Sequence, residues 1–150
     1  MEVCTLKHKL LEKCIEQQTA LLHHLQKEID EAQNQANEYG GPKDRYDAYR
    51  TKLMRQIELY SKQLDKANVV MAVLQTVPVD QKHNKVEYGA LVITDKQKLF
   101  ISAGVGKVEL EGETYFAVSA TVPIVLALKE KKKGEAVVFN GTKYVIEDLC

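Results

Sequence analysis

The sequence has no tryptophan, few prolines and cysteines (three of each), and no surplus of charge of either sign. Its 21 basic residues balance 21 acidic residues, which argues against a protein that coats duplex DNA, because neutralising phosphates requires an excess of lysine and arginine. No apolar run approaches the roughly 20 residues that a membrane-spanning helix needs, and the N-terminal residues lack a signal-peptide pattern. At 150 residues and 45% hydrophobic, the chain has the composition of a globular protein with a real core.

The three cysteines predict reduced thiols in a cytoplasmic protein. They are odd in number and none belongs to a C-x-x-C pair, so neither a disulfide framework nor a zinc site is expected. Cys4 and Cys14 are too far apart to bond to each other, because ten residues of helix span about 15 Å. The four histidines form no cluster at the spacing of metal ligands, so we expect no metal or cofactor of the chain's own.

Residues 1–76 have the periodicity of two long helices. On both sides of a central break, apolar residues recur at steps of three and four, which is the 3.5-residue repeat of a coiled-coil seam. The seam positions are Leu11, Ile15, Gln18, Leu22, Leu25, Ile29, Ala32 and Ala36, then Tyr46, Tyr49, Leu53, Ile57, Tyr60, Leu64, Ala67, Met71 and Leu74. Gln18 is the one amide among them. The pattern predicts two helices that share a single contact line.

The break between the two helical patterns is short. Gly40, Gly41 and Pro42 are contiguous, and a helix does not continue through such a segment. Two amphipathic helices joined by so short a turn are predicted to form an antiparallel hairpin with its tip at residues 38–45. The seam is then satisfied within one chain, which favours a monomer.

Residues 86–150 change to the pattern of a small β-domain. Runs of β-branched and aromatic residues, each bounded by a turn signal, predict strands at 86–93, 98–102, 107–110, 114–118, 136–139 and 143–146. Asn140-Gly141 predicts a hairpin, and residues 123–129, which begin with proline, predict a short helix. Polar residues 77–85 have no period and are predicted to be a linker. The expected fold is α+β, a helical hairpin followed by a mainly antiparallel sheet.

Three short motifs accompany this order of elements. They are EYGALV at 87–92, VPIVLAL at 122–128 and GEAVV at 134–138. Together with the hairpin, they make essentially the whole chain resemble the bacterial transcript-cleavage (Gre) elongation factors. The resemblance implies an FKBP-like C-terminal domain that docks on RNA polymerase and a coiled coil that enters the secondary channel of the polymerase. It also implies an accessory factor, not an enzyme. Sequence-specific binding to DNA and binding to membranes are not expected.

The tip departs from the family pattern, Glu-x-Gly-Asp-(Leu/Ile)-x-Glu-Asn. In that family two tip acids help to hold a second Mg²⁺ at the polymerase's catalytic centre and orient the attacking water, since Mg²⁺ prefers oxygen ligands. Here Glu38 fits the pattern and Asp44 replaces the family's glutamate, while Asp47 lies three residues further from the tip. Gly41 stands where the family has its first aspartate. The missing carboxylate argues against cleavage stimulation of the usual kind.

The resemblance implies two sets of contact residues. At the tip they are Tyr39, Gly40, Gly41, Lys43 and Arg45, near the RNA 3′ end in an elongation complex. On the β-domain the polymerase-docking candidates are Val122, Pro123, Ile124, Leu128, Lys131, Lys132 and Lys133. Tyr46 and Tyr49 are expected to pack in the seam, whereas Tyr39 beside the glycines could be exposed.

The same residues are also compatible with purely structural roles. Asp44 and Asp47 could only complement the helix dipole, and the lysine run could only be a solvated surface. As a whole, the chain could be a non-cleaving competitor in the secondary channel or a coiled-coil adaptor unrelated to polymerase. A peptidyl-prolyl isomerase is disfavoured, because its aromatic pocket is hard to build with no tryptophan and three phenylalanines.

Overall fold

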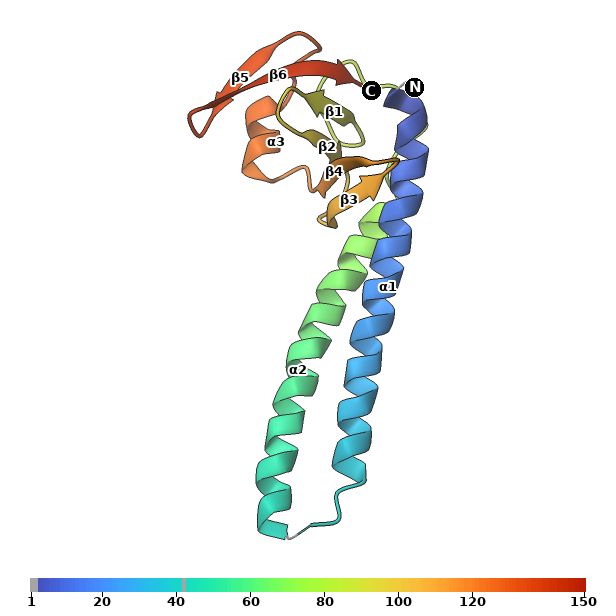
Figure 1. Ribbon diagram of the computed structural model, residues 1–150, viewed down its shortest axis with the longest axis vertical. Helices are drawn as coiled ribbons and strands as arrows, with labels where there is room; N and C mark the ends of the chain where they lie inside the picture. Colours follow the sequence, from blue (N-terminus) through green and yellow to red (C-terminus); the bar gives the residue numbers. More distant parts are fainter. Residues whose placement is uncertain (1–2, 42) are drawn as a thin grey trace. The chain divides into compact units, whose positions relative to one another are not determined.

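A computed structural model describes residues 3–41 and 43–150, with every side chain in those ranges except that of Asp44. The elements in chain order are α1 (Val3–Asn37), α2 (Lys43–Leu74), β1 (Leu91–Thr94), β2 (Lys98–Ile101), β3 (Gly106–Leu110), β4 (Glu113–Val118), α3 (Pro123–Leu128), β5 (Ala136–Phe139) and β6 (Thr142–Leu149). Two long helices therefore precede a sheet with one short helix (Figure 1). The predicted α+β class is confirmed.

Contacts divide the chain into two units. Unit 1 combines the start of α1, up to Gln17, with residues 70–150, and unit 2 consists of residues 18–69. The start of α1 and the end of α2 thus belong to the same unit as the sheet. This differs from a division of the chain at residue 76. The segment predicted as a linker has no helix or strand, yet Val77 and His83 are buried in unit 1.

The sheet of unit 1 has the order β3-β4-β2-β1-β6-β5. All neighbouring pairs are antiparallel except β2 and β4, which are parallel, so the prediction of a mainly antiparallel sheet is confirmed. Successive side chains point to opposite faces of a strand, and both faces of this sheet are buried. Leu99 and Phe100 on β2 illustrate this, since they belong to separate hydrophobic clusters.

Each face of the sheet has its own helical cover. One face, which includes Phe100, packs with Leu10 and Cys14 of α1 and with Leu74 of α2. The opposite face packs with Val125 and Leu128 of α3. The sequence pattern predicts the short helix but neither cover, because it assigns all of residues 1–76 to the hairpin and does not indicate which face of the sheet a helix packs on.

The predicted strand at 86–93 is wrong in its first half. β1 begins at Leu91, and the preceding residues form a turn in which the Ala90 N–H donates to Glu87 O (3.1 Å) and Gly89 has φ of 92°. This positive φ is accessible to glycine and breaks an extended strand. The predicted hairpin turn is confirmed, since Asn140 (φ 50°) and Gly141 (φ 77°) join β5 to β6 with the two positive φ angles of a type I′ turn.

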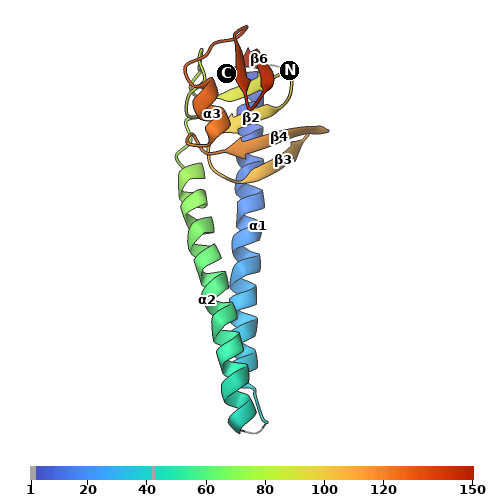
Figure 2. The ribbon, with the colours of Figure 1, turned by 90° about the vertical axis from the view of Figure 1, so that its left-hand side faces the viewer.

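The seam of unit 2 is also confirmed. α1 and α2 lie side by side in both ribbon views (Figures 1 and 2), and Leu25, Ile29, Ala32, Leu53 and Ala67 are buried between them. The remaining predicted seam residues of unit 2 other than Gln18 are half-buried. The Gln18 side chain is buried as well, and its Nε2 donates to Ala67 O at 2.9 Å. The amide therefore bonds across the seam to the other helix.

The prediction of three reduced thiols is wrong. Cys4 and Cys150 form a disulfide with Cα atoms 5.3 Å apart, and Cys14 is free and buried. The sequence separation of 146 residues carries no information about this pairing, which depends on β6 ending beside the first turn of α1. In the chain-entropy model, closing so long a loop stabilises the folded state by about 5 kcal/mol.

Candidate functional site

The tip of unit 2 is built around three tyrosines. The ring centroid of Tyr39 lies 5.2 Å from that of Tyr46 and 5.3 Å from that of Tyr49, with tilted planes. The hydroxyl of Tyr49 donates to Gln35 Oε1 of α1 at 3.3 Å. All three rings are half-buried, so Tyr46 and Tyr49 pack as predicted, and Tyr39, which could have been exposed, also packs in part. Aromatic pairs at this separation attract each other, and this holds the Tyr39 ring against the start of α2.

Gly41 lies beside the hydroxyl end of the Tyr39 ring. A Cβ atom added at this position would lie 2.7 Å from Cζ of Tyr39, closer than non-bonded carbon atoms approach. Any side chain at position 41 would therefore require the hydroxyl end of the Tyr39 side chain to shift. At Gly40, by contrast, an added Cβ meets nothing within 4 Å. Position 41 is therefore the more crowded of the two glycine positions at the tip.

The acids predicted to act on a shared Mg²⁺ come from both sides of the turn between α1 and α2. Glu38 follows the end of α1, and Asp47 lies in the second turn of α2; both are exposed. The side chain of Asp44 lies outside the described residues. Within the described part of the chain, no group of three His, Cys, Asp or Glu side chains is arranged to hold a metal ion.

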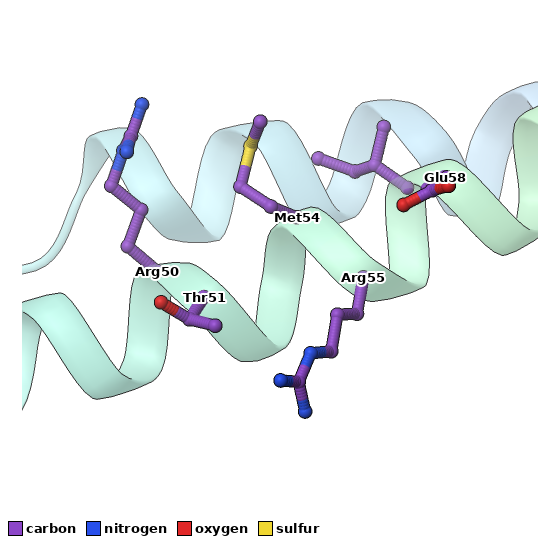
Figure 3. Close-up of a pocket in the computed structure, with 6 residues that line it drawn as sticks. Arg50, Thr51, Met54, Arg55 and Glu58 are labelled. Atoms are coloured by element: carbon purple, nitrogen blue, oxygen red, sulfur yellow. The ribbon is translucent and has the colours of Figure 1, made fainter.

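Basic residues dominate the adjoining stretch of α2. Lys43 and Arg45, predicted as tip contacts, are both exposed. Further along, Arg50, Met54 and Arg55 border a surface hollow of about 520 Å³ that also includes Thr51, Ile57 and Glu58. Figure 3 shows Arg50 and Met54 projecting to one side of α2 and Arg55 to the other. Met54 is 49% exposed, which is high for a large apolar side chain beside a seam.

The docking candidates on α3 divide into exposed and buried residues. Pro123 occupies the start of the helix and is exposed, whereas Val122 and Ile124 are half-buried against the sheet. Leu128 is fully buried, so its prediction as a docking residue is wrong: its side chain completes the core under α3. The sequence interpretation missed Leu126, which is 55% exposed.

The lysine run after α3 is partly neutralised by acids. Lys131 Nζ lies 3.9 Å from Glu135, and Lys133 Nζ lies 3.7 Å from Asp148. The backbone oxygen of Lys131 also accepts the N–H of Val86 at 2.8 Å, which fastens this loop to the sheet. Exposed ion pairs of this kind stabilise a protein little. Lys131 and Lys133 are thus paired with acids on the surface, and Lys132 between them is exposed.

The sequence interpretation also missed a second apolar stripe on α1. Val3, Leu10 and Cys14 recur at helical spacing and are buried, and Lys7 lies on the same stripe. The Lys7 side chain is fully buried, with Nζ donating to Gln81 O (2.6 Å), Gly89 O (3.3 Å) and Cys150 O (3.1 Å). Burial lowers the pKa of Lys7, although the charge of Asp80 opposes this in part. The signal in the sequence was the step pattern 4, 3, 4 over residues 3–14.

In the described part of the chain, no helix combines the length and the apolar character that crossing a membrane requires. Comparison with known protein families, with curated proteins and with solved structures finds no match to this chain.

Proposed function

We propose that this protein is a cytoplasmic, Gre-like accessory factor that binds bacterial RNA polymerase and occupies its secondary channel without stimulating transcript cleavage. The observation that supports the non-cleaving form is Gly41, which carries no carboxylate where a cleavage factor has an acid and has the hydroxyl end of Tyr39 close to it instead. With no carboxylate there, the tip has lost one oxygen ligand and one negative charge for a shared Mg²⁺.

The proposed division of labour assigns one role to each unit. The hairpin of unit 2 is the inserted rod, and its tip presents packed tyrosines with exposed Lys43 and Arg45 near the RNA 3′ end. The β-domain in unit 1 docks on polymerase through the exposed residues of α3, Pro123 and Leu126, with Lys132 beside them. Competition with cleavage factors for the channel then follows from occupancy alone.

The first experiment tests polymerase binding and its surface. Purified chain should be retained by immobilised bacterial RNA polymerase, and Leu126→Asp should weaken retention at least tenfold. Val138→Asp is the matched control, because Val138 on β5 is also exposed (69%) and lies in the same unit but outside the proposed docking residues. Equal retention of the two variants would show that polymerase is not bound through Leu126. If the wild-type chain were not retained at all, the protein would be better explained as a coiled-coil adaptor unrelated to polymerase.

The second experiment tests cleavage on backtracked elongation complexes. The wild-type chain should leave the RNA uncut and should slow cleavage by an added cleavage factor in proportion to its concentration. RNA shortening that is lost in Asp44→Ala but retained in Asp65→Ala, an exposed acid further along α2, would contradict the non-cleaving role.

A further inference from the structure

The two arms of the helical hairpin in unit 2 carry opposite net charge. Residues 18–41, on the α1 side, include four acids and one lysine. Residues 43–69, in α2, include seven basic residues and four acids. The chain as a whole is neutral, so this separation of charge between two adjacent helices is a local feature of the hairpin.

On each arm these charges form a stripe with the 3.5-residue repeat of a coiled coil. The acidic stripe, along α1 and the residue after it, consists of Leu21, His24, Glu28, Glu31, Gln35 and Glu38. The basic stripe of α2 consists of Arg45, Ala48, Lys52, Arg55, Leu59 and Lys62. Both stripes follow the same steps of three and four residues. Every member is exposed except Glu28, which is half-buried.

The two stripes lie on the same face of the hairpin. Stripe residues precede seam residues of their own helix by one or two positions, as Lys52 precedes Leu53. Because α1 and α2 are antiparallel, the same rotation away from the seam brings both stripes to one face. Figure 3 shows Arg55 of the basic stripe on the side of α2 opposite to Arg50 and Met54.

The stripes also contain apolar side chains that unit 2 does not cover. Leu21 is 42% exposed in the acidic stripe, and Leu59 is 56% exposed in the basic stripe. Among the described residues of unit 2, ion pairs join side chains one turn apart in the same helix, such as Lys27 and Glu31 at 4.0 Å, and none joins α1 to α2. The opposite charges of the two arms are therefore not paired with each other within one hairpin.

The charges of the two stripes lie at matching levels along the hairpin. Tyr49 bonds to Gln35 across the seam, so these two residues lie at about the same level. Counting along both helices from this pair, each acid of one stripe lies within one residue of the level of a basic residue of the other. The matching residues are Glu38 with Arg45, Glu31 with Lys52, and Glu28 with Arg55.

We propose that the two stripes form a self-association surface, through which two copies of this chain pair face to face in a symmetric dimer. A two-fold axis along the hairpins lays α1 of one copy on α2 of the other, so that acidic stripe meets basic stripe twice. An axis across the hairpins would instead stack each stripe on its own copy, and like charges would repel. Charge complementarity therefore selects the arrangement in which the two hairpins point the same way.

A second copy is the partner that this surface fits, because one chain supplies both complementary stripes at matching levels. Exposed ion pairs contribute little each and are screened by salt, so the dimer is expected to be weak and sensitive to salt. The prediction of a monomer rests on the seam alone, which the stripes leave intact. Neither the surface nor its tests depend on the function proposed above, because each readout uses the purified chain alone.

The first test is sedimentation equilibrium of the full-length chain at about 5 to 500 µM, in about 50 mM and about 500 mM salt. We expect a monomer–dimer equilibrium with a Kd on the order of 10–100 µM at the lower salt, weakened about tenfold or more at the higher. A chain that stays monomeric throughout would overturn the proposal and leave the stripes to a partner of another kind. Growth beyond a dimer would contradict the closed two-fold arrangement.

The second test reverses single charges. Arg55→Glu should raise the Kd about tenfold or more, because it meets Glu28 of the other copy. Arg50→Glu is the matched control, since Arg50 lies on the other side of α2 (Figure 3) and its change should alter the Kd less than about twofold. Combining Arg55→Glu with Glu28→Arg should restore the dimer, because the pair forms again with its charges exchanged.

The changed side chains are at the surface, and circular dichroism checks that each variant keeps its helices. Equal weakening by Arg50→Glu and Arg55→Glu, or no recovery in the double variant, would contradict the charge pairing.

The third test determines how the two hairpins are oriented. Isotopically labelled and unlabelled chains are mixed and treated with a carbodiimide, which joins a carboxylate to an amine that it contacts. We expect linked peptides of mixed isotope that join Glu31 to Lys52. Mixed links from Glu38 at the tip to Lys66 at the far end of unit 2 would show hairpins that point opposite ways and would contradict the proposed axis. Links found only within one chain would overturn the proposal.

Discussion

Unit 1 and unit 2 contain parts of the same two helices but bury them to different depths. In unit 1, α1 carries a second buried stripe, which includes Leu10 and Cys14, because a sheet face covers it. In unit 2 the helices cover only each other, and a two-helix contact buries a single line of residues. A helix thus buries a wider set of side chains where a sheet packs against it than where only another helix does.

The difference predicts unequal local stability. Most helical stability in proteins comes from the packing of an apolar face, and segments with few buried contacts open locally at lower free energy. We expect the amide hydrogens of residues 18–69 to exchange before those of the sheet, so the predictions below are read by hydrogen exchange resolved to each unit.

The largest effect is expected in unit 1. Phe100 is fully buried in the centre of the sheet, and Phe100→Ala should lower the free energy of unfolding by about 3–5 kcal/mol through lost burial and a cavity. Denaturant midpoints measure the loss, and exchange should rise across the sheet. Val138→Ala is the control, because Val138 is 69% exposed on an edge strand and its truncation should change little. A similar loss in both variants would show that burial does not set the stability of the sheet.

A smaller effect is expected in the seam. Leu53 is 2% exposed on α2, and Leu53→Ala should destabilise unit 2 by about 2–3 kcal/mol, at the low end for a buried leucine because a two-helix seam can relax around the gap. Exchange should rise within residues 18–69 while the sheet keeps its protection. Leu59→Ala, at an exposed position of the same helix, should have an effect below about 0.5 kcal/mol. If Leu53→Ala unfolded both units together, the proposed difference in local stability would be wrong.

The smallest effect concerns the amide in the seam. The oxygen that accepts from Gln18 belongs to Ala67 in the interior of α2, so it also has its helical partner. Gln18→Leu should therefore raise the stability of unit 2 by about 1 kcal/mol, since it buries an apolar side chain and strands no donor. Gln18→Ala should lower it, because it leaves a gap. Hydrogen exchange in unit 2 measures both effects. If Gln18→Leu destabilised unit 2 as much as Gln18→Ala, the hydrogen bond of the Gln18 amide would contribute more to stability than we expect.

Much of the candidate site was readable because it depends on local patterns. The three-and-four spacing specified the seam, and Gly40 and Gly41 marked the tip. The sequence could not indicate that the hydroxyl end of Tyr39 lies beside Gly41, because the contact depends on side-chain directions within the turn. It also assigned Leu128 to the surface, although the spacing of Val125 and Leu128 identifies the buried face of α3 and leaves Leu126 outside.

The sequence alone determined the α+β class, the helical pair, the Asn140-Gly141 hairpin turn and the absence of an acid at position 41, because each follows from residues close together in the chain. Only the tertiary structure decided which elements cover the two faces of the sheet, why Lys7 can be buried, and that Cys4 meets Cys150 across 146 residues of chain. Those outcomes require segments distant in sequence to pack against one another, and no local pattern encodes the partner of a buried side chain.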